Sequence, residues 1–205
     1  MERAVFVDRD GVISEEVGYI SDVEHFRLIP KSAEAVKLIN QRGLKIIVIT
    51  NQSGVARGYF SEEVLGHINR KIEQLLSDQG ALLDGIYYCP HHPEGTVEAY
   101  RMECDCRKPS TGLLVKAAHE HAIDLSSSYL VGDKRTDIEC AHRAGAKGIL
   151  VLTGYGKDEL SQIDSAALAH PEYVAADLLD AVQWIIKDKA SEKPGDPHHK
   201  IECNR

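Results

Sequence analysis

Five short apolar runs recur along this chain, and each is followed by polar or glycine-containing residues. Short runs of β-branched and other apolar residues without polar alternation indicate strands that are buried on both faces, as parallel strands are. The segments between the runs carry apolar residues at the spacing of three and four that is typical of helices. The predicted strands are Ala4–Val7, Lys45–Ile49, Ile86–Tyr88, Ser128–Val131 and Gly148–Leu152, and the predicted helices are Ser32–Gln41, Ser61–Ser77, Gly112–Ala122, Asp137–Ala144 and Asp177–Lys189.

The alternation of strands and helices predicts the architecture. It is typical of βαβ units and therefore of an α/β fold with a doubly wound, mainly parallel sheet. A length of 205 residues suits one well-buried core, so we expect a single domain over residues 1–190. Residues 191–205 contain two prolines and a glycine but few apolar side chains. This composition predicts a poorly ordered tail.

The net charge and the cysteine count narrow the functional classes. A formal net charge of −8 disfavours unspecific binding to nucleic acid or to anionic lipid. No apolar run approaches the length that spans a bilayer, and the N-terminus does not resemble a secretory signal. Five cysteines without such a signal favour reduced thiols, some of them bound to metal, over a disulfide framework. We therefore expect a cytoplasmic monomer that binds neither nucleic acid nor membrane.

The first polar motif, Asp8-Arg-Asp10-Gly11, directly follows the first predicted strand. Alternate positions at a strand end direct both carboxylates to one side, and glycine allows the backbone to turn sharply. One carboxylate could attack the phosphorus of a phosphomonoester while the second protonates the leaving oxygen. Asp8 suits the nucleophile and Asp10 the acid and base. The alternative is a solvent-facing turn in which both aspartates cap backbone amides.

Two further motifs offer groups that bind phosphate. Thr50, at the end of the second predicted strand, begins a polar run that extends to Gly54, and its hydroxyl could hold a phosphoryl oxygen. Lys108, which directly precedes Pro109, offers a cation for the phosphoryl group. Arg107 beside it offers a planar fork for a second phosphate or for sugar oxygens. The run at Thr50 alone is equally compatible with an ordinary strand-to-loop turn, and surface solvation is the usual fate of an Arg-Lys pair, although this pair adjoins the proposed metal loop.

Asp133 and Asp137 stand where the fourth predicted strand gives way to a helix. Mg²⁺ prefers oxygen ligands and typically takes one or two carboxylates together with phosphate oxygens and waters. The carboxylates of Asp8 and Asp133, with the carbonyl of Asp10, would complete such a site. Asp137 could orient these ligands, but capping the helix is its default role.

Four metal-competent side chains form two tight pairs, Cys-x-His and Cys-x-Cys, within residues 89–106. Three thiolates and one imidazole make a closed tetrahedral zinc set with no open position for catalysis, so we expect a structural zinc loop. Chance clustering of reduced cysteines is the alternative. The predicted ligands are Cys89, His91, Cys104 and Cys106, with His92 as the alternative to His91.

The order of these motifs resembles the haloacid dehalogenase superfamily of phosphotransferases. Within it, the segments 8–13, 18–20, 50–58, 89–95 and 104–109 resemble the family of D-glycero-D-manno-heptose-1,7-bisphosphate 7-phosphatases. The resemblance implies Mg²⁺-dependent hydrolysis of the sugar 7-phosphate through an aspartyl phosphate, in bacterial heptose precursor and lipopolysaccharide biosynthesis. It also implies Mg²⁺ as catalytic and Zn²⁺ as structural cofactor.

The resemblance assigns roles to individual residues. It implies that Asp8 is the nucleophile, that Asp10 is the proton donor, and that Thr50 and Lys108 stabilise the phosphoryl group. Substrate-binding residues would be Glu16, Val17, Gly18, Tyr19, Asn51, Gln52, Ser53, Arg107 and Lys134.

Three other functions remain open from the sequence. The stretch between Asp10 and Thr50 leaves no room for an inserted cap domain, which suits a small sugar phosphate but also histidinol phosphate. Histidinol-phosphate phosphatases share the motifs and the zinc ligands, although the spacing between His91 and Cys104 favours the heptose type. A polynucleotide 3′-phosphatase fits poorly because the chain is acidic and lacks interleaved basic and aromatic residues. A zinc-binding interaction module without turnover is the alternative from a different class.

Overall fold

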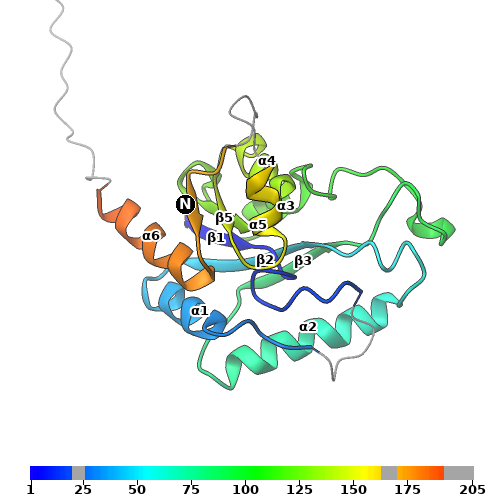
Figure 1. Cartoon of the computed structure of the whole chain (residues 1–205), viewed down its shortest axis with the longest axis horizontal. Coiled ribbons are helices and arrows are strands. Elements are labelled where there is room, and N and C mark those ends of the chain that lie inside the picture. The colour runs from blue at the N-terminus through cyan, green and yellow to red at the C-terminus, as the bar shows by residue number, and fades with distance from the viewer. Residues whose placement is uncertain (20–25, 163–169, 192–205) are drawn as a thin grey trace, which may run out of the picture.

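A six-stranded parallel sheet runs through the computed structural model of this protein, which describes residues 1–19, 26–162 and 170–191 (Figure 1). The strand order is β3-β2-β1-β4-β5-β6. The chain therefore places β2 and β3 on one side of β1, and then β4, β5 and β6 on the other side. The strand order reverses between β1 and β4. Ligands of doubly wound sheets bind at this switch point, beyond the carboxyl ends of the strands. The strands are β1 (Ala4–Val7), β2 (Lys45–Asn51), β3 (Gly85–Cys89), β4 (Tyr129–Gly132), β5 (Lys147–Val151) and β6 (Tyr173–Ala175).

Helices cover both faces of the sheet, which confirms the predicted doubly wound α/β fold (Figure 1). One face is covered by α1 (Ser32–Gln41), α2 (Glu62–Ser77) and α6 (Leu178–Ser191), and the other by α3 (Gly112–Glu120) and α4 (Arg135–Arg143). The short helix α5 (Gly156–Ser161) follows β5, and single 3₁₀ turns lie at Glu98–Tyr100 and Leu125–Ser127.

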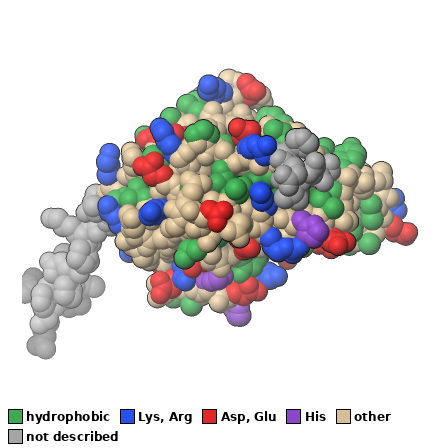
Figure 2. Space-filling view, turned by 90° about the horizontal axis from the view of Figure 1, so that it is seen from below, with side chains coloured by type: hydrophobic (Ala, Val, Ile, Leu, Met, Phe, Trp, Pro, Cys, Tyr) green, Lys and Arg blue, Asp and Glu red, His purple; other side chains and the backbone are tan. Residues whose placement is uncertain are grey.

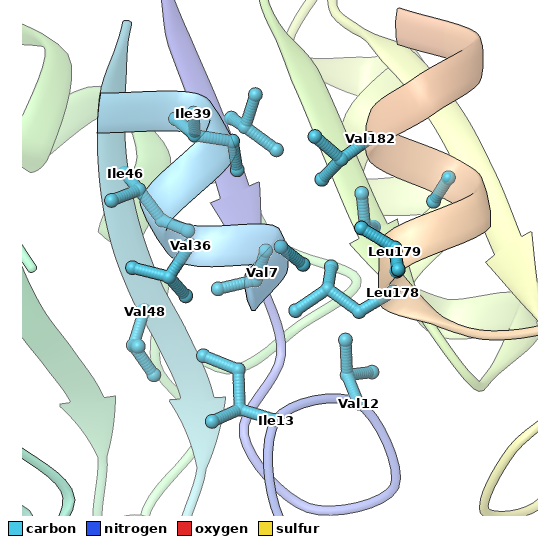
Figure 3. Packing of buried hydrophobic residues seen from close by; sticks show 14 of the residues in the cluster. Val7, Val12, Ile13, Val36, Ile39, Ile46, Val48, Leu178, Leu179 and Val182 are labelled. Carbon is cyan, nitrogen blue, oxygen red and sulfur yellow. The ribbon is translucent and has the colours of Figure 1, made fainter. Parts of the chain in front are cut away.

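The alternation of side chains along β1 supplies both halves of the core. Val5 and Val7 pack on the side of α1, α2 and α6, whereas Ala4 and Phe6 pack on the side of α3 and α4. Figure 3 shows Val7 among side chains of α1 and α6. Ile39 of α1 is fully buried there, and burying a side chain of this size contributes about 1.5–3 kcal/mol. Packing on both faces therefore fixes the position of β1 and of Asp8, the residue that follows it.

Besides the two 3₁₀ turns, one strand and one helix among the described residues were not predicted from the sequence. The strand β6 has only three residues, and α5 has six, so neither is long enough to show a period. The helix α4 begins at Arg135, two residues before the predicted start, because the Asp137 carboxylate accepts a hydrogen bond from the backbone N–H of Lys134 and caps the helix. Helix α6 ends at Ser191, and the remainder of the predicted tail lies outside the described residues.

The surface is of mixed polarity. Figure 2 shows acidic and basic side chains interspersed with apolar surface on one face of the molecule. Among the described helices, none combines the length and the apolar composition that crossing a bilayer requires. The predicted cytoplasmic location and monomeric state remain predictions.

Candidate active site

The polar motifs meet at the carboxyl edge of the sheet because the strands are in register. Val7 of β1 pairs with Val48 of β2 and with Val131 of β4, so the residues that follow these strands lie side by side. They enclose a cavity of about 370 Å³. The cavity is lined by Asp8, Asp10, Glu16, Gly18, Tyr19, Thr50, Asn51, Gln52, Ser53, Gly54, Arg107, Lys108, Lys134, Thr136, Asp137 and Tyr155.

Lys108 lies at the floor of this cavity as a buried cation. Its ammonium is 3.0 Å from Asp8 Oδ1 and 2.6 Å from Asp137 Oδ1, and it donates a hydrogen bond of 3.0 Å to the carbonyl of Ile49. Burial alone would lower the pKa of Lys108, but the charges of Asp137 and Asp8 raise it above its ordinary value. Lys108 therefore carries a positive charge beside the carboxylate of Asp8 at neutral pH.

Asp137 serves both the helix and the site. Its Oδ2 caps the start of α4, as the default sequence interpretation expected, while its Oδ1 pairs with Lys108. Burial raises the pKa of Asp137, and the neighbouring Lys108 opposes that rise. Since an unpaired buried ammonium is costly, the ion pair holds Lys108 in place next to Asp8.

Three carboxylates come close enough to share one cation. One oxygen each of Asp8, Asp133 and Asp137 lies within 4.8 Å of the others. Asp133 Oδ2 accepts a hydrogen bond from the backbone N–H of Tyr155, whereas its buried Oδ1 accepts none from the described residues. Burial and the nearby charge of Asp8 raise the pKa of Asp133 to about 7. An unpartnered buried oxygen in an all-carboxylate set fits a hard cation such as Mg²⁺.

Asp10 faces the same cavity but is held by different partners. Both of its oxygens accept hydrogen bonds from the guanidinium of Arg9, a side chain that is itself fully buried. Asp10 Oδ2 also accepts a hydrogen bond of 2.8 Å from Gln52 Nε2, which donates a second one of 3.0 Å to Thr50 Oγ1. The Asp10 carboxylate is thus held by Arg9 and Gln52, and it is not one of the three carboxylates that could share a cation. Its carbonyl as a magnesium ligand remains a prediction.

Asn51 orders the loop that carries Lys108. The side-chain amide of Asn51 donates to the carbonyl of Lys108 at 3.1 Å and accepts from its backbone N–H at 3.0 Å. This reciprocal pair joins the end of β2 to a residue 57 positions away. A side chain predicted to bind substrate therefore also positions the backbone of Lys108, the cation predicted to bind the phosphoryl group.

The rim of the cavity is partly aromatic. Lys134 Nζ lies 4.5 Å from the ring centroid of Tyr155 and 3.6 Å from Glu16 Oε2. Tyr19, on the same rim, packs edge to face against Tyr59 with ring centroids 4.5 Å apart. The described cavity therefore combines a charged floor with a rim of rings and one cation.

The predicted zinc ligands converge on one point. The sulfur of Cys104 is 3.5 Å from that of Cys89 and 3.3 Å from that of Cys106, and His91 Nδ1 is 3.3 Å from Cys106 Sγ and 3.8 Å from Cys89 Sγ. Four ligands arranged tetrahedrally at zinc–sulfur distances of about 2.3 Å stand about 3.7 Å apart. Burial and the adjacent thiols raise the pKa of Cys106, so a bound cation would be needed to favour its thiolate. The arrangement fits a structural Zn²⁺.

Hydrogen bonds join the zinc loop to the polar run after β2. The backbone N–H of Ala56 donates to the carbonyl of Pro90, and the backbone N–H of Val97 donates to the carbonyl of Ala56. Arg107, just beyond the last cysteine, donates to the carbonyl of His91 at 3.4 Å. The zinc loop therefore supports both the segment after β2 and the arginine at the cavity wall.

Comparisons with known proteins agree with this geometry. A protein of Thermosynechococcus vestitus named D-glycero-D-manno-heptose-1,7-bisphosphate 7-phosphatase is 46% identical over 89% of this chain and 94% of its own length. The Escherichia coli K12 protein named D-glycero-beta-D-manno-heptose-1,7-bisphosphate 7-phosphatase is 40% identical over 93% of this chain and 96% of its own. This chain belongs to the heptose bisphosphate phosphatase family.

Structural and motif comparisons place the family within its superfamily. A protein-family model described as HAD-hydrolase-like matches residues 105–181. The crystal structure of D,D-heptose 1,7-bisphosphate phosphatase from B. bronchiseptica, complexed with magnesium and phosphate, matches with a TM-score of 0.80 and 29% identity. The match covers 91% of this chain and 99% of that chain. A HAD-like phosphatase from Mesorhizobium loti has a TM-score of 0.76 and 32% identity over 90% of this chain and 87% of its own. These matches favour the heptose family over the histidinol phosphate alternative.

The heptose phosphatase site contains more than the motifs indicated. Of the predicted site residues, Val17 does not line the cavity and its side chain is exposed, while Asp133 lies buried beside Asp8. The cavity adds Gly54, which ends the polar run after β2, Thr136, which lies between Asp133 and Asp137, and Tyr155, which belongs to none of the predicted motifs. The turn at residues 153–156 could have indicated Tyr155 from the sequence, because it follows the predicted strand that became β5. Residues beyond the carboxyl ends of parallel strands lie at the same edge of the sheet, where ligands bind.

Proposed function

We propose that this protein hydrolyses the 7-phosphate of D-glycero-D-manno-heptose 1,7-bisphosphate in a Mg²⁺-dependent reaction. The observation that supports this most directly is the position of Asp8. Its carboxylate lies in the cavity between a buried cation, Lys108, and a second buried carboxylate, Asp133. Family membership supports the sugar bisphosphate as the substrate.

In the first half of the reaction, an oxygen of Asp8 attacks phosphorus and forms an aspartyl phosphate. The bond from phosphorus to the sugar oxygen breaks, and Asp10 gives that oxygen a proton. Lys108 offsets the negative charge on the phosphoryl group. Thr50 Oγ1 accepts a hydrogen bond from Gln52, so its own proton is free to donate to a phosphoryl oxygen.

In the second half, Asp10 acts as a base. It takes a proton from a water molecule whose oxygen attacks phosphorus, the bond between Asp8 and phosphorus breaks, and inorganic phosphate leaves. The hydrogen bonds from Arg9 and Gln52 hold the Asp10 carboxylate in the cavity for both proton transfers. A Mg²⁺ ion held by Asp8 and Asp133 would neutralise part of the charge of the phosphoryl group when bound.

Recognition of the sugar falls to the cavity wall and rim. Arg107 and Lys134 offer positive charge at separate places, which suits a substrate with a second phosphate. Gly18 and Tyr19 approach from the segment after β1. The zinc loop contributes by holding Arg107 against His91, and it takes no part in the chemistry.

Phosphate release from defined substrates tests the proposal. We expect Mg²⁺-dependent hydrolysis of the α or β anomer of heptose 1,7-bisphosphate at a kcat/KM at least tenfold above that for histidinol phosphate. Asp8→Asn should abolish turnover, because an amide does not attack phosphorus effectively. Asp84→Asn is the matched control, since Asp84 binds Lys45 outside the cavity. Preferred hydrolysis of histidinol phosphate, or near-normal turnover by Asp8→Asn, would contradict the proposal.

A further inference from the structure

Tyr155 is a residue of the cavity rim to which neither the sequence motifs nor the comparisons assign a role. It follows β5 and directly precedes α5, and its side chain is 43% exposed although it lines the cavity. Its backbone N–H donates to Asp133 Oδ2 at 2.9 Å. The backbone of Tyr155 is therefore held next to the carboxylates at the floor of the site.

The ammonium of Lys134 lies over the ring of Tyr155. The distance from Lys134 Nζ to the ring centroid is 4.5 Å, well within the range in which the negative face of an aromatic ring attracts a cation. Glu16 Oε2, at 3.6 Å, is a second partner on the rim. The phenolic oxygen of Tyr155 makes no hydrogen bond within the described ranges of the chain, so its contact with Lys134 is made by the ring and not by the hydroxyl.

Without this ring, the ammonium would have other partners. Lys134 is the sequence neighbour of Asp133, and its stem has four rotatable carbons. The carboxylates that would hold Mg²⁺ therefore also attract this side chain. An ammonium that turned inward would leave the rim without its cation.

We propose that Tyr155 is a positioning residue that holds Lys134 at the cavity rim, where its ammonium binds the second phosphate of a bisphosphate substrate. The identity of that anion rests on the proposed function. The contact between the Tyr155 ring and the Lys134 ammonium is independent of the proposed function. Because every residue except proline keeps the backbone N–H that binds Asp133, replacing the side chain removes the ring and leaves that hydrogen bond in place.

Steady-state kinetics of two variants separate the ring from the hydroxyl. Tyr155→Leu should raise KM for heptose 1,7-bisphosphate about three- to tenfold, the size expected of a partly desolvated cation–π contact. KM for heptose 7-phosphate, which lacks the second phosphate, should stay unchanged. Tyr155→Phe should behave like the unmodified protein. Tyr87→Leu is the matched control, since it removes the contact of Lys116 with Tyr87 outside the cavity.

A double substitution tests whether Tyr155 acts through Lys134. Lys134→Met should raise KM for the bisphosphate by at least as much as Tyr155→Leu, and adding Tyr155→Leu to it should change KM by less than about twofold. Additive losses would overturn the proposal, as would equal losses on both substrates. A Tyr155→Phe variant as impaired as Tyr155→Leu would assign the role to the hydroxyl and also overturn it.

Nuclear magnetic resonance keeps this inference distinct from the proposed function. The ε-methylene protons of Lys134, assigned by their loss in Lys134→Met, should be shifted upfield by the ring in the unmodified protein and in Tyr155→Phe. Tyr155→Leu should abolish the shift. If no sugar bisphosphate is hydrolysed, the proposed function fails while this shift still supports the contact. An unshifted signal in the unmodified protein overturns the positioning role even where the enzyme is active.

Discussion

Replacing Gly11 with alanine tests how closely the turn after β1 is fitted to the carboxylate of Asp133. Gly11 has a φ of +83°, in the left-handed region that only glycine adopts freely. A Cβ built there would lie 2.1 Å from Asp133 Oδ2 and 2.7 Å from its Cγ. Asp133 cannot withdraw easily, because the same oxygen accepts the backbone N–H of Tyr155.

Two separate costs follow for Gly11→Ala. The left-handed backbone costs about 1–2 kcal/mol for a residue with a Cβ. To reach ordinary contact, the distance between the new methyl group and Asp133 Oδ2 must increase by about 1.3 Å. A misplacement of about 1 Å at a catalytic group can lower the rate about 100-fold, or about 3 kcal/mol on the barrier. We therefore expect a large loss of kcat and weaker activation by Mg²⁺.

Gly145→Ala separates the two costs. Gly145 has a nearly equal φ of +78°, it is exposed, and a Cβ there would meet nothing within 4 Å. Thermal melts and initial rates across a Mg²⁺ titration should show a similar backbone penalty in both variants but reduced activity only in Gly11→Ala. If folded Gly11→Ala kept its kcat and its Mg²⁺ requirement within about threefold of the unmodified protein, the inferred fit between Gly11 and Asp133 would be refuted.

The remaining predictions concern the metals and the second phosphate. Cys104→Ser should lose zinc and melt about 10 °C lower, whereas Cys140→Ser should keep its zinc; full zinc content of Cys104→Ser by metal analysis would contradict this. Arg107→Ala should weaken binding of the bisphosphate about tenfold more than binding of a monophosphate, as measured by KM, and equal losses would remove its recognition role. With a pKa raised to about 7, Asp133 destabilises the metal-free fold by on the order of 4 kcal/mol once it ionises, so stability falls as pH rises from about 4 to 7. Added Mg²⁺ should therefore raise the melting temperature more at pH 8 than at pH 5, and an equal rise at both would disprove the linkage.

Much of the fold could be read from local pattern. The apolar runs predicted five of the six strands, and the start of α1 at Ser32 was predicted to the residue. These elements are long enough for a periodic pattern of apolar and polar residues to be visible in the sequence, and their buried positions are occupied by apolar side chains. The three-residue strand β6 is too short to display one, and it forms because Ile149 of β5 pairs with Tyr173.

The sequence by itself determined which chemical groups stand at the strand ends: the paired aspartates after β1, the hydroxyl of Thr50 at the end of β2, and the four zinc ligands. Only the tertiary structure decided how these groups meet. The ion pair of Lys108 with Asp137 joins residues 29 positions apart, and the contact of Lys134 with Tyr155 depends on β4 lying beside β5. Side-chain period records burial within one element, but it carries no information on strand order, and strand order brings these loops together.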